Sequence, residues 1–130
     1  MITTKKIIST DKAPQAIGPY SQAVQAGDFL FTSGVIPVNP VTGEIVLGGI
    51  SEQADQAIGN LIELLKASGC EPEDVVKTTV FIKNMDDFNL VNEVYEKYFT
   101  KSFPARSCVA VAKLPKNVLI EIEAVAIVKG

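Results

Sequence analysis

VLIEIEAVAIV, residues 118–128, presents two rows of side chains if it forms a β-strand, because successive side chains of a strand point to opposite faces of the sheet. One row is wholly apolar and consists of Val118, Ile120, Ile122, Ala124, Ala126 and Val128. The other row is apolar except for Glu121 and Glu123. Neither row suits bulk water, so we expect both faces of the sheet to be covered.

The residues before position 51 predict a hairpin followed by an irregular segment. In SQAVQAGDFLFTSG, residues 21–34, two short runs flank Gly27-Asp28, which favours a β-hairpin turning at that pair. Residues 36–50 carry prolines and a Thr-Gly pair, and this composition interrupts helices and strands alike. We therefore expect an excursion without regular structure before the first helix.

Two segments show apolar residues at helical spacing. The first helix is expected over about 52–67, with Ser51 as its cap and Gly69 ending it in the left-handed conformation. The second helix is expected near 87–99. Its apolar stripe consists of Phe88, Val91, Tyr95 and Tyr98.

Two further strands complete a single sheet. Residues 75–84 are rich in β-branched side chains, and residues 103–115 form a strand after Pro104. The order β-β-α-β-α-β-β predicts an α+β fold, a mixed sheet with both helices on one face, in a single domain over residues 1–130. Because two helices cover only one face, we expect another copy of the chain to cover the other, which makes the protein a homo-oligomer.

Composition excludes several classes of function. The net charge of −3 and the scattered 12 Lys and Arg residues argue against a nucleic-acid partner. The chain has no histidine, which excludes a Ser-His-Asp triad and an imidazole-ligated metal. Its two cysteines lack metal-type spacing, and no apolar run approaches the ~20 residues of a membrane span. We expect a cytoplasmic protein with no metal, no cofactor and no membrane partner.

Arg106 stands at the start of an otherwise apolar strand and shares a strand face with Cys108. A guanidinium beside small apolar side chains requires an anion. The residues alone leave two anions open, an internal carboxylate such as Glu121 or Glu123 and the carboxylate of a ligand. Glu121 and Glu123 are compatible with acid–base catalysis or with solvated or paired charges that have no function. Cys108 is equally compatible with a small buried side chain that only packs in the core.

Four segments resemble the RidA family, also called the YjgF family. They are IGPYSQA (17–23), FTSGVIPVNPVTGEI (31–45), VVKTTVFIKNMDDFNLVNEVYEKYF (75–99) and FPARSCVAVAKLPKNVLIEIEAVAIV (103–128). The resemblance covers nearly the whole chain, and PARSCV followed by IEIE is its most specific part. It implies a chorismate-mutase-like fold assembled as a homotrimer, with clefts between subunits. The family's deaminase branch hydrolyses reactive enamines and imines, such as 2-aminoacrylate and 2-iminopropionate, to the 2-keto acid and ammonia without a metal or cofactor.

The same resemblance implies roles for individual residues. Arg106 is expected to hold the substrate carboxylate, the backbone carbonyl of Cys108 to place a water, and Glu121 to orient or activate that water. The other pocket residues that it implies are Tyr20, Ser33, Gly34 and Asn92. Val35 and Ala110 stand where the family usually has Gln and Glu, which leaves pocket polarity and substrate range open.

Three alternatives remain open from the sequence. A non-catalytic module could bind a small metabolite in the same cleft and regulate a partner. A ribonuclease or translation-inhibitor role has been attached to some relatives, but the acidic charge and the absence of histidine argue against it. A purely structural trimer would leave Arg106 without an evident purpose.

Overall fold

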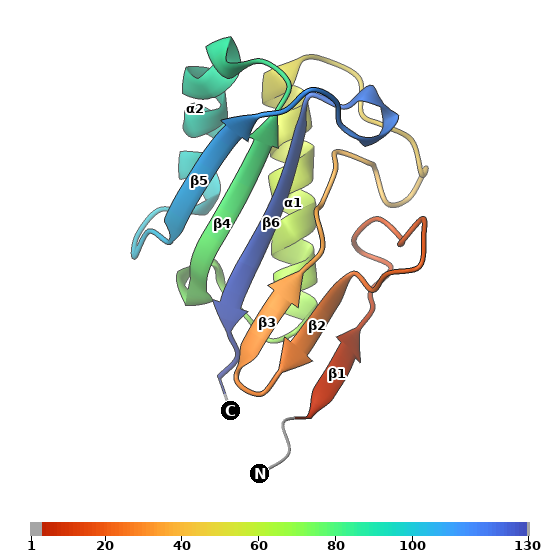
Figure 1. Cartoon of the computed structure of the whole chain (residues 1–130), viewed down its shortest axis with the longest axis vertical. Coiled ribbons are helices and arrows are strands. Elements are labelled where there is room, and N and C mark those ends of the chain that lie inside the picture. The colour runs from red at the N-terminus through yellow and green to blue at the C-terminus, as the bar shows by residue number, and fades with distance from the viewer. Residues whose placement is uncertain (1–3, 130) are drawn as a thin grey trace.

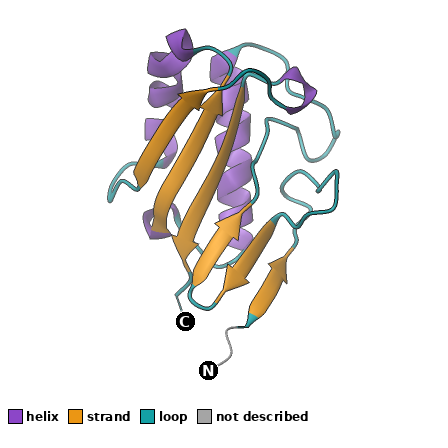
Figure 2. Ribbon diagram, in the orientation of Figure 1, coloured by secondary structure: helices purple, strands orange, loops and turns teal. Residues whose placement is uncertain are grey.

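A computed structural model of the chain describes residues 4–129. Within this range, six strands form one sheet in the order β1-β2-β3-β6-β4-β5, in which only β4 and β5 are parallel neighbours. In chain order the elements are β1 (Lys5–Ile8), β2 (Ala23–Ala26), β3 (Phe29–Thr32), α1 (Ile50–Ala67), β4 (Val75–Ile82), α2 (Phe88–Tyr98), β5 (Ala105–Ala110) and β6 (Ile120–Ile127). Both helices lie on one face of the sheet, which confirms the predicted α+β fold (Figure 1, Figure 2).

Two local expectations are corrected by the structure. Strand β1 was not predicted, because its sequence KKII has no period-two pattern and only Ile8 is buried. Helix α1 begins at Ile50 with Gly49 as its N-cap, so Ser51 is not the cap. The Glu52 carboxylate accepts a hydrogen bond from the backbone N–H of Gly49 at 2.8 Å, which satisfies a donor at the start of the helix. The predicted left-handed residue after the helix is confirmed at Gly69, whose φ is 77°.

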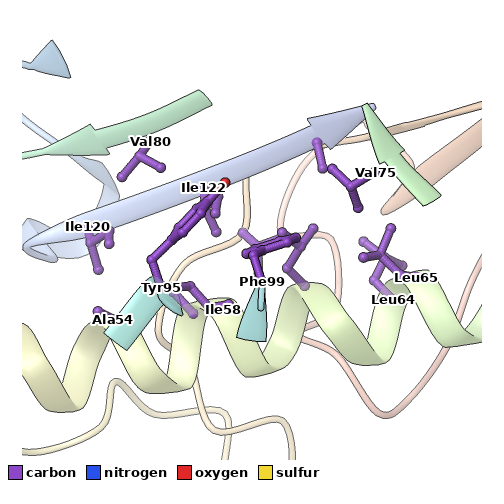
Figure 3. Packing of buried hydrophobic residues seen from close by; sticks show 14 of the residues in the cluster. Ala54, Ile58, Leu64, Leu65, Val75, Val80, Tyr95, Phe99, Ile120 and Ile122 are labelled. Atoms are coloured by element: carbon purple, nitrogen blue, oxygen red, sulfur yellow. The ribbon is translucent and has the colours of Figure 1, made fainter. Parts of the chain in front are cut away.

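The hydrophobic core lies between the two helices and the sheet. The wholly apolar row of β6 faces it, since Ile120, Ile122 and Ala126 are fully buried. The rings of Tyr95 on α2 and of Phe99, the residue after its last turn, stack at 4.6 Å between α1 and the sheet (Figure 3). Each fully buried large apolar side chain stabilises the fold by about 1.5–3 kcal/mol, so this layer fixes the position of α2 relative to the strands.

The other face of the sheet carries large apolar side chains that the helices do not cover. Phe29 and Phe31 of β3 are 46% and 47% exposed, and Val109 and Ile127 are exposed as well. Strand register places Phe31 opposite Val125, so this open face continues into the second row of β6. No helix within residues 4–129 is long and apolar enough to cross a membrane.

Candidate functional site

The residues expected to form one site fall into two groups in the single chain. The first group, called the β5 edge, consists of Arg106, Cys108 and Asn92. The second group, called the β3 cleft, consists of Tyr20, Ser33, Gly34 and Glu121. Strands β6 and β4 lie between β3 and β5 in the sheet, so the segments that carry Tyr20, Ser33 and Gly34 are distant from β5 (Figure 1). Glu121 lies on β6 itself and is separated from Arg106 by the sheet face on which it lies.

Arg106 projects from β5 towards helix α2. It pairs in register with Thr78 of β4, whose fully buried side chain bonds to the Tyr95 hydroxyl at 2.8 Å. The guanidinium carbon lies 4.8 Å from the ring centre of Tyr95 and 5.5 Å from that of Phe88, within the range of a cation–π contact. Arg106 is therefore on the helix side of the sheet.

The carboxylates of β6 lie on the opposite side of the sheet. Glu121 pairs in register with Phe81, and both alternate with residues that face the core. Among residues 4–129 the ion pairs are Lys66–Glu63 and Lys129–Asp74, and neither involves Arg106. The internal pairing that the sequence left open is absent from this part of the chain, which favours a ligand as the anion for Arg106.

Asn92 lies on the same face of α2 as the two rings, four residues after Phe88 and three before Tyr95. Its Oδ1 atom is buried and has no hydrogen-bond partner among the described residues. A buried acceptor without a donor costs about 1–3 kcal/mol. The β5 edge thus combines a cation without a carboxylate partner and an amide oxygen without a donor among residues 4–129.

Cys108 offers its backbone rather than its thiol. Burial raises the pKa of the thiol, although the Arg106 charge acts in the opposite direction, so the neutral thiol is favoured over the nucleophilic thiolate. The Val111 N–H donates to the Ile82 carbonyl at 3.0 Å. Because backbone groups of a strand alternate in direction, the carbonyl of Cys108 points away from β4 to the free edge of the sheet.

Three residues of the β3 cleft, Tyr20, Ser33 and Gly34, line a cavity of about 380 Å³, and Glu121 is not among its lining residues. The segments that flank β3 supply most of the rest of the lining, with Leu64 of α1 and Lys116. The Ser33 hydroxyl donates to the Ser21 carbonyl at 2.6 Å, so its proton is already engaged. The Tyr20 hydroxyl accepts from the Ile17 N–H at 3.2 Å, while its ring remains 47% exposed at the mouth.

Gln22 fixes one wall of this cleft and was missed by the sequence analysis. Its side-chain amide donates to the carbonyls of Thr10 and Pro14 at 3.0 and 2.7 Å, and its Oε1 accepts from the Thr10 N–H at 2.7 Å. A buried glutamine within the quoted segment IGPYSQA is the signal that could have indicated this role, because buried amides require partners.

Glu121 packs directly against Gly34, and a Cβ atom at position 34 would overlap its carboxylate. Burial raises the pKa of the Glu121 carboxyl, and the negative charge of Glu123 raises it further. A carboxyl with a raised pKa is suited to accept and return a proton near neutral pH. Within residues 4–129 there is no group of three or more acidic, Cys or His side chains that could hold a metal.

Comparison with known proteins identifies the family. The family model described as Endoribonuclease L-PSP matches residues 10–128. The chain belongs to this family, the RidA (YjgF) family that the sequence resembled. The human protein named 2-iminobutanoate/2-iminopropanoate deaminase is 54% identical over 123 residues, which cover 95% of this chain and 90% of that protein.

Solved structures agree with the fold. A structure from Thermotoga maritima is 55% identical, has a TM-score of 0.94, and the match covers 98% of this chain and 100% of that one. Escherichia coli TdcF with bound serine is 48% identical with a TM-score of 0.89, covering 94% of this chain and 98% of that one. Relatives in the family therefore share the arrangement of strands and helices described above.

Proposed function

We propose that this RidA-family protein hydrolyses 2-imino acids and their enamine tautomers to 2-keto acids and ammonia. The observation that carries the proposal is Arg106, a cation held on two aromatic rings with no carboxylate partner among residues 4–129. The deaminase name of the human relative and the serine bound to TdcF, itself an amino acid with a carboxylate, support the same class of ligand.

Arg106 binds the substrate carboxylate in this proposal. Its planar guanidinium donates two parallel hydrogen bonds to the two carboxylate oxygens, which fixes the position of the adjacent C=N carbon. The Asn92 amide at the same edge adds a polar contact to the ligand or to the neighbouring chain. Binding and orientation are thus supplied by groups of the β5 edge.

Glu121 handles the water in the same proposal. The ionised carboxylate accepts a proton as water adds to the imine carbon, with the Cys108 carbonyl as a second acceptor for that water. The protonated carboxyl returns this proton to nitrogen, which gives a tetrahedral intermediate with one hydroxyl and one amino group. The carboxylate then takes the hydroxyl proton and passes it to the amino group, so the C=O bond of the keto acid forms as the C–N bond breaks and ammonia leaves. The step needs no redox partner, since 2-iminopropanoate plus water equals pyruvate plus ammonia.

The separation of the two groups requires a second chain. Arg106 lies on the helix side at the β5 edge, while Glu121 lies on the other side of the sheet beside the β3 cleft. We infer that the β5 edge of one subunit meets the β3 cleft of its neighbour in a homotrimer, which also covers the apolar open face. Light scattering is expected to give about three times the chain mass of 13.9 kDa.

The deciding experiment measures turnover of freshly generated 2-aminoacrylate. A pyridoxal-phosphate lyase acting on serine releases it, and pyruvate formation is followed with and without this protein. Acceleration by the wild type, its loss in Arg106→Ala and its near-loss in Arg106→Lys would support the proposal, because lysine keeps the charge without the two-pronged geometry. A folded Arg106→Ala variant with full activity would contradict the role of Arg106.

The ribonuclease function in the family description has weaker support here. With a net charge of −3 the chain neutralises few phosphates, and it has no histidine for acid–base work on RNA. The non-catalytic alternative differs in one result, since a metabolite sensor would bind keto or amino acids without accelerating imine hydrolysis.

A further inference from the structure

The two aromatic rings that contact the Arg106 guanidinium belong to a single helix, α2. Phe88 and Tyr95 are seven residues apart on α2, which is about two turns and a rise of ~10.5 Å. The guanidinium carbon lies over both rings, 5.5 Å from the ring centre of Phe88 and 4.8 Å from that of Tyr95. Both rings therefore contact the guanidinium, and together we call them the aromatic clamp.

The clamp is itself anchored in the core. The Tyr95 hydroxyl is bonded to Thr78 of β4 at 2.8 Å, and the Tyr95 ring stacks on Phe99 at 4.6 Å (Figure 3). Tyr95 and Thr78 are 6% and 0% exposed, so the ring and the hydroxyl lie among buried side chains. Burial raises the pKa of the Tyr95 phenol, with the Thr78 bond and the Arg106 charge acting in the opposite direction, so the hydroxyl remains a neutral hydrogen-bonding group.

The geometry points to Phe88 and Tyr95 as positioning residues that hold the Arg106 guanidinium ready for the carboxylate of a 2-imino acid. This inference rests on the proposed function of Arg106. Ordering a free arginine side chain costs conformational entropy, and a side chain already held in place avoids that cost when the ligand binds. The clamp leaves the edge of the planar guanidinium free to donate two parallel hydrogen bonds.

The aromatic clamp and the Glu121 carboxyl are expected to affect different kinetic constants. The substrate carboxylate does not change charge as water adds to the imine carbon, so Arg106 binds ground state and transition state alike. Loosening the clamp should then raise KM and leave kcat nearly unchanged. The pH profile, which depends on Glu121 on the other face, should not move.

The test replaces Phe88 by Leu, which keeps an apolar side chain of similar size and removes the aromatic face. We expect KM for 2-iminopropanoate and Kd for pyruvate to rise roughly 3–10-fold, with kcat within about twofold. Phe88→Tyr retains the aromatic face and should restore both values. The Nε–H signal of Arg106 in NMR spectra, shifted by the ring currents of the clamp, should move in Phe88→Leu and return in Phe88→Tyr.

A matched pair of tyrosine variants separates positioning from general stability. Both tyrosines lie on α2. Tyr95→Phe loses the hydroxyl bonded to Thr78, and Tyr98→Phe loses the hydroxyl that bonds to Asp55 of α1 at 2.6 Å. Both should lower the melting temperature, whereas only Tyr95→Phe should weaken pyruvate binding and shift the Arg106 signal.

Unchanged KM, pyruvate affinity and Arg106 signal in a folded Phe88→Leu variant would overturn the clamp. A loss confined to kcat would overturn it too, because it would place Phe88 in the chemical step. If the wild type does not accelerate imine hydrolysis, the proposed function fails, and the Arg106 signal alone then decides whether the clamp exists.

Discussion

At the β5 edge, Arg106 packs against two rings of its own chain, one of which is anchored in the core by Thr78 and Phe99. At the β3 cleft, Glu121 has a glycine on one side and a like-charged neighbour, Glu123, on the same strand face. The first group is stabilised by its surroundings, whereas the second has a carboxyl whose charged form is disfavoured by burial and repulsion.

This difference indicates how the site divides its work. A substrate-binding cation gains from being rigid before the ligand arrives, and the fold supplies that rigidity within one chain. A carboxyl that must accept and return a proton gains from a raised pKa, and partial burial beside another carboxylate supplies it. Because the two groups lie on opposite sides of the sheet, we expect them to work together only across subunits.

The largest expected effect comes from mixing two inactive variants. Arg106→Ala and Glu121→Gln should each lower kcat/KM by roughly 100-fold or more. In a trimer whose sites combine Arg106 of one chain with Glu121 of the next, random mixing of equal amounts leaves both groups intact in about one quarter of the sites. Co-refolded mixtures, with subunit exchange verified by native mass spectrometry, should therefore regain about that fraction of wild-type activity.

The control mixes Arg106→Ala with itself under two different tags, which should regain nothing. If mixed trimers form but stay as inactive as their parents, Arg106 and Glu121 do not combine across subunits. That result would contradict a site shared between the β5 edge of one chain and the β3 cleft of the next.

A smaller effect is expected from adding one methyl group at the β3 cleft. In Gly34→Ala the new Cβ occupies the place of the Glu121 carboxylate, which is the end of a flexible side chain and can rotate away. We expect kcat to fall on the order of 10-fold because the carboxyl is displaced, with KM little changed since Arg106 is untouched. Steady-state kinetics and a thermal melt measure both properties.

Gly59→Ala on helix α1 is the matched control, because its Cβ would meet only the Tyr98 hydroxyl at an ordinary 3.5 Å. It should keep full activity and gain stability, as Ala is favoured over Gly inside helices by about 1 kcal/mol. Normal kcat in Gly34→Ala would show that Glu121 does not need its observed position.

Much of the fold could be predicted from the sequence because periodicity reports burial. The alternating row of β6 and the apolar stripe of α1 both face the core as expected. Strand β1 escaped prediction because pairing with β2, rather than burial, determines it. The start of α1 escaped because the Glu52 side chain, and not Ser51, satisfies the end of the helix.

The sequence could propose the site only as a set of residues, without their arrangement. The family motifs named Arg106 and Glu121, but strand parity alone could not say that the helices cover the side of Arg106. The clamp was hidden within an apolar stripe, where Phe88 and Tyr95 looked like ordinary core residues. Their contact with a cation depends on the parallel pairing of β4 and β5, which brings Arg106 level with Thr78 and hence under α2.

The smallest expected effect is on stability. It tests whether the charged form of Glu121 is disfavoured by its surroundings, in contrast to Arg106. The pKa of Glu121 is raised above its ordinary value of 4.5, by burial first and by Glu123 second. In the unfolded chain the carboxyl ionises near the ordinary value, so the folded state binds more protons in the window above it. Stability from this group is therefore greatest at low pH and is lost as the pH rises through the raised pKa.

Glu121→Gln removes that loss, and its melting temperature should exceed that of the wild type at pH 7 by on the order of 1–2 °C, with a smaller difference at pH 4. Glu93→Gln, at an exposed position of α2, should show no such pH-dependent gain. A Glu121→Gln variant less stable than the wild type at pH 7 would mean that the carboxylate is stabilised where it lies, and the division between the two halves of the site would then have to be redrawn.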